Sequence, residues 1–209
     1  MGKRLGRKRL YSLNKQGQTY STSTPGSAVS ASIGHSKVMR HGTEIITEIY
    51  VDLAAQAGAW TSTGASLSGS IMGVSSSLPT VAVQSAPAYL TKLSTDNNGV
   101  INLMEINCIE TPVGGTTDIN LLAATASLPW SGSGGLANKS DLFTCINAGT
   151  AVIGSAAAAA IDGNQLATYN YLYLGSGAAV TSRSQPPYTA GKFIIRLFGM
   201  AVPADVDNT

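Results

Sequence analysis

The stretch TEIITEIYVDL, residues 43–53, decides the fold class of this chain. Its odd-numbered positions from Ile45 to Leu53 are apolar apart from one threonine. Its even-numbered positions from Glu44 to Asp52 carry three acids. A hydrophobic period of two places alternate side chains on opposite faces of an extended chain. The stretch therefore predicts a strand with one buried and one solvated face.

Further strand signals lie along the chain and are separated by turn residues. Residues 88–110 predict two strands joined at Asn98-Gly99, because this dipeptide suits the tight primed turn of a hairpin. Residues 119–123 and 142–148 predict two more short strands. Together these signals indicate a sheet protein with many turns.

The last strand signals and one alanine run complete the pattern. Residues 166–177 and 190–200 predict a pair of strands that contact each other. The alanines at 156–160 favour helix by propensity, but Gly154 and Gly163 limit any helix there to two turns. The Gly- and Ser-rich segments 58–80 and 128–141 predict loops.

Composition supports the same fold class. Charged residues are only 11% of the 209 residues, against about 25% in ordinary globular domains, and there are 23 glycines. We therefore expect an all-β protein with an antiparallel β-sandwich or jelly-roll-like body over residues 44–199. An extended basic arm over residues 1–43 precedes this body, and a tail over residues 200–209 follows it.

Charge is divided unevenly between arm and body. Residues 1–43 contain eight Lys/Arg and no acid, whereas residues 44–209 carry a net charge of −6. A basic arm on a mildly acidic body predicts a partner of opposite sign. Leucines and a tyrosine interleave the bases, and this favours a groove on a protein over phosphates alone. The residues expected to contact the partner are Lys3, Arg4, Leu5, Arg7, Lys8, Arg9, Leu10, Tyr11 and Lys15.

No motif predicts catalysis, a metal site or a cofactor. His35 and His41 are the only histidines, and the arm offers no cysteine or carboxylate near them to complete a metal site. The G-x-G-x-x-A pattern at residues 132–137 lacks the preceding strand and following helix of a dinucleotide site. We expect a non-enzymatic protein. A carbohydrate-active sandwich, with carboxylates brought together from different strands, is the alternative left open.

The two cysteines and the tyrosines predict buried positions. Cys108 and Cys145 lie in apolar strand-like runs, which favours free buried thiols, with a single bridge as the alternative. Tyr169, Tyr171 and Tyr173 share one strand face. A row of this kind suits a sheet face covered by a loop or forming a subunit interface. Stacking on nucleic-acid bases is the alternative.

Targeting signals are not evident. The N-terminus lacks the apolar core of a signal peptide, and no run reaches the ~20 apolar residues of a membrane span. We expect a protein made in a cytoplasm, without a membrane partner.

Several segments resemble small structural proteins of tailed phages that infect marine bacteria. These segments are MGKRLGRKRLYSLNKQGQ (1–18), EIITEIYVDL (44–53), YNYLYLGSG (169–177) and YTAGKFIIRLFG (188–199). The similar proteins are rich in Gly, Ser and Ala, are encoded close to capsid genes and have no catalytic motif. The resemblance implies a virion component, namely a capsid decoration (cement) protein bound to the major capsid protein.

On this interpretation the arm clamps neighbouring capsid subunits and the body forms a homo-oligomer, with a trimer favoured. The protein is then made in the host cytoplasm and resides in the virion. Two alternatives remain at this point. One is a nucleic-acid-binding protein that uses the basic arm. The other is a head fibre or adhesin that presents the loops 54–80 and 125–141 to a receptor.

Overall fold

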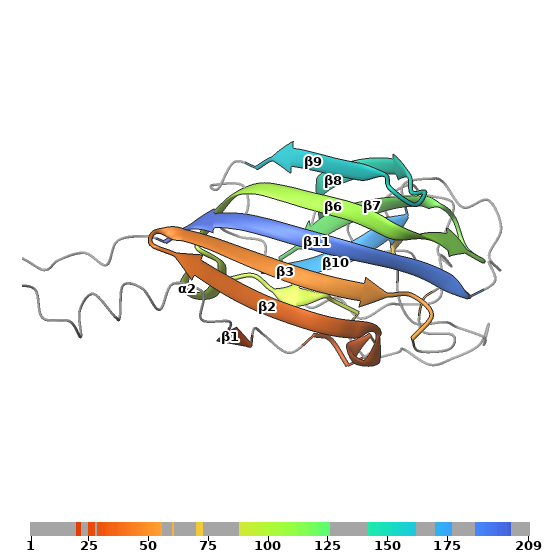
Figure 1. The fold of residues 1–209 in the computed structure, drawn as a ribbon, viewed down its shortest axis with the longest axis horizontal. Helices are drawn as coiled ribbons and strands as arrows, with labels where there is room; N and C mark the ends of the chain where they lie inside the picture. The colour runs from red at the N-terminus through yellow and green to blue at the C-terminus, as the bar shows by residue number, and fades with distance from the viewer. Residues whose placement is uncertain are drawn as a thin grey trace, which may run out of the picture.

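Two antiparallel sheets pack face to face, so the prediction of an all-β sandwich is confirmed (Figure 1). The computed structural model describes residues 20–21, 25–27, 29–55, 60, 70–72, 88–125, 142–161, 170–176 and 187–201. The larger sheet has six strands in the order β1-β2-β3-β11-β6-β9. These strands are β1 (Tyr20–Ser21), β2 (Ile33–His41), β3 (Glu44–Asp52), β11 (Ala190–Met200), β6 (Val100–Val113) and β9 (Ala156–Ala160).

The smaller sheet lies behind it in Figure 1. Its order is β4-β10-β7-β8, and β5 also pairs with β10. These strands are β4 (Ser70–Ile71), β10 (Tyr171–Ser176), β7 (Asp118–Ala124), β8 (Leu142–Thr150) and β5 (Thr91–Lys92). A short 3-10 helix, η1 (Ser30–Ser32), precedes β2, and a one-turn helix, α2 (Thr95–Asn98), links β5 to β6.

The core lies between the sheets and is built from alternate residues. On β3, Ile45, Ile49 and Val51 are almost completely buried, as the alternation in the sequence predicts. On β11 the same period buries Phe193 and Ile195. Full burial of a side chain of this size stabilises the fold by about 1.5–3 kcal/mol. The outward residues between them are only partly buried, so each of these strands has one core face and one outer face.

The Asn98-Gly99 hairpin predicted from the sequence is wrong. Ser94 caps α2 by accepting a hydrogen bond from the Asn97 N–H, and the helix then ends at Gly99 with φ 68°. A side chain at Gly99 would collide with the backbone carbonyl of Met200. The dipeptide therefore ends a helix that carries the chain from one sheet to the other.

Two further predictions about strands are corrected. β10 and β11 do not pair with each other, because β11 has β3 on one side and β6 on the other. The alanine run forms β9, an edge strand on β6, and not a helix. Ala157 and Ala159 pack against the core from this strand, and small side chains permit that close approach. Tertiary packing thus overrides the helix propensity of alanine.

The boundary of the predicted arm is also wrong. Residues 33–41 form β2 and pair with β3 through a turn at Gly42. Val29, still earlier, is fully buried in the core. The folded body therefore begins before residue 30, well inside the expected arm. At the other end, β11 continues to Met200, one residue into the expected tail. Residues 1–19 and 202–209 lie outside the described part.

In the part of the chain that the structure describes, no helix is long and apolar enough to cross a membrane.

Candidate interaction surface

The arm residues predicted to contact a partner all lie outside the described residues, and so does Tyr169. The structure does locate where the arm joins the body. Tyr20 and Ser21 of β1 pair with Val38 and Lys37 of β2, at the edge of the six-stranded sheet. Residues 1–19 therefore connect to the body at this lateral edge.

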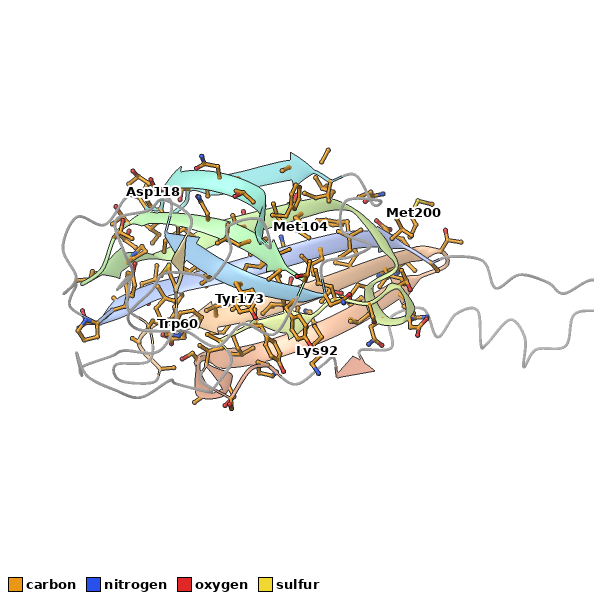
Figure 2. The ribbon with its side chains drawn as sticks, turned by 180° about the vertical axis from the view of Figure 1, so that it is seen from behind. Trp60, Lys92, Met104, Asp118, Tyr173 and Met200 are labelled. Carbon is orange, nitrogen blue, oxygen red and sulfur yellow. The ribbon has the colours of Figure 1, made fainter. Side chains whose placement is uncertain are left out.

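The tyrosine row lies on the outer side of the five-stranded sheet, and Figure 2 labels Tyr173 there. Leu172 and Leu174 lie behind it in the core. The ring of Tyr89 lies 5.0 Å from that of Tyr171 and 6.4 Å from that of Tyr173, centroid to centroid. Tyr173 is 0% exposed. The buried ring of Tyr173 is closed to base stacking, and its burial fits the alternative of a covering loop through Tyr89. Tyr171 is partly exposed, so the subunit interface stays a prediction.

The opposite side of the molecule presents a broad surface that we call the outer face. It consists of the outward side chains of β2, β3, β11 and β6. In Figure 1 these strands lie at the front, and no helix or strand of the described part crosses them. Every residue of the outer face is partly exposed. Its members are Lys37, Met39, Ile46, Glu48, Tyr50, Asp52, Leu103, Glu105, Asn107, Glu110, Lys192, Ile194, Arg196 and Phe198.

One row of the outer face is apolar across four strands. Met39 is in register with Ile46, Ile46 with Phe198, and Phe198 with Leu103. All four side chains are partly exposed. Scattered apolar residues on a surface need no explanation, but a continuous apolar row marks a place where a partner can gain by covering it.

The next row along the strands carries alternating charge. Lys37, Glu48, Arg196 and Glu105 occupy successive strands in register. The Lys37 Nζ lies 2.9 Å from Glu48 Oε1, and the Arg196 Nε donates to Glu48 Oε2 at 3.0 Å. A second ion pair joins Lys192 and Glu110 at 2.8 Å. Exposed pairs of this kind contribute little stability individually.

The electrostatics of these carboxylates favours contact over proton transfer. Partial burial alone would raise the pKa of Glu48, but hydrogen bonds from Lys37 and Arg196 outweigh it and hold the pKa below its usual value. The hydrogen bond from Lys192 lowers the pKa of Glu110 and raises that of Lys192. A catalytic general acid needs the opposite shift, a raised carboxyl pKa. Both carboxylates are instead held ionised and oriented.

The two cysteines are free and buried, in agreement with the prediction of free thiols. Burial raises the pKa of the Cys145 thiol to about 12 and also raises that of Cys108. Cys108 lines a cavity of about 10 Å³ with Ile106 and Phe193, which is the space of a single water. Within the described ranges, no three His, Cys, Asp or Glu residues are grouped so that they could hold a metal ion.

Sequence reasoning identified the alternation within β3 but missed the outer face as a surface. The missing information is register: which residues of distant strands share a row depends on pairings such as Arg196 with Glu48 and with Glu105. The available signal was the pair of apolar outward residues, Ile46 and Phe198, in strands that also carry outward charges.

Comparison of the chain with protein-family models, curated proteins and solved structures finds no match.

Proposed function

We propose that this chain is a non-enzymatic structural protein of a virion, a capsid decoration (cement) protein whose basic arm clamps neighbouring major capsid subunits. The division of charge carries this proposal. Six bases and no acid precede β1, whereas residues 44–209 are net acidic. The bases in question are Lys3, Arg4, Arg7, Lys8, Arg9 and Lys15.

The place where the arm joins the body supports a clamp. The arm starts at the lateral edge of the sandwich, next to β2, and not on either sheet face. A chain of 19 residues can reach at most about 63–68 Å when extended. On this proposal the arm uses that length to cross from one subunit to its neighbour. Weak contacts repeated over a shell then add up by avidity.

The composition of the arm supports a protein partner. Phosphate neutralisation requires bases only. The arm also contains Leu5, Leu10, Tyr11 and Leu13 between the bases. Such side chains gain free energy in an apolar groove on a folded partner, with acidic residues beside it for the bases. The resemblance of residues 1–18 to phage structural proteins points to the same class of partner.

The test is binding of the purified chain to empty shells of the major capsid protein from the same genome. Three proteins are compared: the full chain, a variant lacking residues 2–19, and a variant with Leu5, Leu10 and Leu13 changed to Ser. We expect the deletion to weaken shell binding at least tenfold and the serine variant to weaken it too. Unchanged binding by the deletion variant would refute the clamp.

A parallel titration with a short DNA duplex separates the proposal from the nucleic-acid alternative. Binding of DNA at low salt with release at moderate salt, together with no shell binding, would make the arm a phosphate binder. In that outcome the serine variant would bind DNA as well as the full chain does, because all six bases remain.

A further inference from the structure

The side chains of the outer face are ordered so that one symmetry operation places complementary residues of two copies opposite each other. Across β2, β3, β11 and β6 the charged row reads positive, negative, positive, negative: Lys37, Glu48, Arg196 and Glu105. A two-fold axis can lie just above the outer face, parallel to the strands and midway between β3 and β11. Rotation about this axis reverses the order. It places β2 opposite β6 of a second copy and β3 opposite its β11, and it keeps each row at its own level.

The charged row is self-complementary under this operation. Lys37 then faces the partner's Glu105, and Glu48 faces the partner's Arg196. Asp52 and Lys192 are in register on β3 and β11, four residues along each strand from Glu48 and Arg196. Under the same operation Asp52 faces the partner's Lys192. Opposite charges across an interface fix register and suppress other partners.

The apolar positions match in the same way. Met39 faces the partner's Leu103, and Ile46 faces the partner's Phe198. In the row on the other side of the charges, Tyr50 faces the partner's Ile194. The Met39 row is therefore apolar on all four strands, whereas the Tyr50 row is apolar only on β3 and β11, because His35 and Asn107 occupy it on β2 and β6. The operation places apolar side chains opposite each other at these apolar positions, and it places opposite charges face to face in the charged row.

Pairing within the sheet explains only part of this pattern. Glu48 and Arg196 are cross-strand neighbours, so their complementarity follows from contacts inside one chain. Lys37 and Glu105 are not neighbours, because two strands separate them. Three strand spacings place their backbones about 14 Å apart. Their charges nevertheless follow from their own cross-strand neighbours, because Lys37 pairs with Glu48 and Glu105 is in register with Arg196. The partly exposed apolar row of Met39, Ile46, Phe198 and Leu103 has no such pairing of charges behind it, and this row is what a second copy explains.

The size of the outer face suits a dimer of standard type. Four strands span about 19 Å and nine residues span about 30 Å. The face therefore offers about 600 Å² on each copy, or about 1,200 Å² in total, at the lower end of specific interfaces. Aligned packing of two twisted sheets is a common arrangement, with strands about 30° apart.

We infer that the outer face is the interface of an isologous homodimer and that its occupant is a second copy of this chain. The inference is independent of the virion proposal, since it uses none of residues 1–19. A two-fold interface also differs from the trimer that we expected from the sequence.

The test uses two charge reversals, Lys37→Glu and Glu105→Lys, in the full chain. Each variant alone places two like-charge pairs across its own homodimer. A mixture of the two variants forms a heterodimer in which Glu at 37 faces Lys at 105, and the native Lys37 faces the native Glu105. Contacts within each chain are the same in homodimer and heterodimer, so only facing residues distinguish them.

The measurement is sedimentation equilibrium of each variant, of their mixture and of the unaltered chain. We expect the unaltered chain to dimerise, each variant to show a dimer Kd raised at least about tenfold, and the mixture to recover most of the native affinity. Thr144→Glu, an exposed change on β8 of the other sheet, is the control and should leave the Kd unchanged. Thermal unfolding followed by circular dichroism checks that each variant is folded.

Three results would overturn the inference. The first is that the unaltered chain and a chain lacking residues 2–19 both stay monomeric at about 100 µM. The second is a dimer whose Kd neither reversal changes. The third is a mixture that dimerises no better than its components. If either reversal unfolds the chain, Met39→Glu and Leu103→Glu replace them. Each of these is expected to weaken the dimer, and a mixture of Met39→Glu with Leu103→Lys is expected to restore it.

Discussion

Replacing Asn98 with alanine tests the link between the two sheets. The Asn98 side chain is 2% exposed and makes two hydrogen bonds. Its Nδ2 donates to Thr47 Oγ1 at 2.8 Å, and its Oδ1 accepts from the Ser94 N–H at 2.9 Å. The first bond ties the one-turn helix α2 to the six-stranded sheet, and the second closes the helix N-terminus. Alanine removes both and leaves the buried Thr47 hydroxyl without this partner.

The expected cost follows from these two bonds. An unsatisfied buried partner costs about 1–3 kcal/mol, which applies to the Thr47 hydroxyl because this residue is 0% exposed. Loss of the bond to Ser94, whose backbone can reach water, costs about 0.5–1.5 kcal/mol. We expect Asn98→Ala to lower the free energy of unfolding by about 3 kcal/mol. In a domain of this size that corresponds to a fall in Tm of about 6–12 °C.

Urea unfolding followed by tryptophan fluorescence and circular dichroism measures this loss. Asn97→Ala is the matched control, because Asn97 is exposed on the same turn and should change stability by less than about 0.5 kcal/mol. A double-mutant cycle with Thr47→Val should give a coupling energy of at least about 1 kcal/mol. A loss below 0.5 kcal/mol for Asn98→Ala, or strict additivity in the cycle, would refute the reasoning.

Three further predictions concern glycine, pH and cysteine. Gly99→Ala should lower the free energy of unfolding in urea by more than about 3 kcal/mol, because a positive φ combines with a collision against the backbone. Gly154 has φ 84° and open space around it, so Gly154→Ala should lower it by only about 1–2 kcal/mol. Equal losses for the two variants would contradict this reasoning. The lowered pKa of Glu48 means that the folded state binds fewer protons than the unfolded chain, so stability present above pH 4.5 is lost as the pH falls through the folded pKa. Glu48→Gln should therefore flatten the decline in urea midpoint between pH 5 and pH 3, and an unchanged slope would argue against the ion pairs. Cys145, with its pKa raised to about 12, should react with a thiol reagent at pH 8 only after unfolding in urea, and rapid labelling of the native protein at this residue would show that the site is open.

The sequence predicted what depends on neighbours along the chain. The period of two in residues 43–53 gave both the strand and its buried face, because a strand alternates its side chains whatever it pairs with. Free, buried cysteines followed from the apolar runs around them. The charge division between arm and body is also a property of the sequence alone.

The rest depended on contacts between distant segments. Asn98-Gly99 suits a hairpin equally well as a helix end, and the choice was made by Ser94, which caps the helix, and by Thr47, 51 residues away. The alanines of β9 are strand because β6 offers an edge to pair with. The outer face could not be foreseen because it requires the order of strands, which places β11 between β3 and β6.

The strand order of the six-stranded sheet also determines when that sheet can be completed during synthesis. β3 and β6 each pair with β11 and not with each other, so the six-stranded sheet consists of two separate parts until residues 190–200 have left the ribosome. At ~5–20 residues per second, the wait from the end of β6 to the start of β11 is about 4–15 s. During that interval two open strand edges are free to pair wrongly, with another chain or with each other. The nascent chain is thus most exposed to aggregation just before its last described strand arrives, and crowding of ribosomes on one message would raise that hazard.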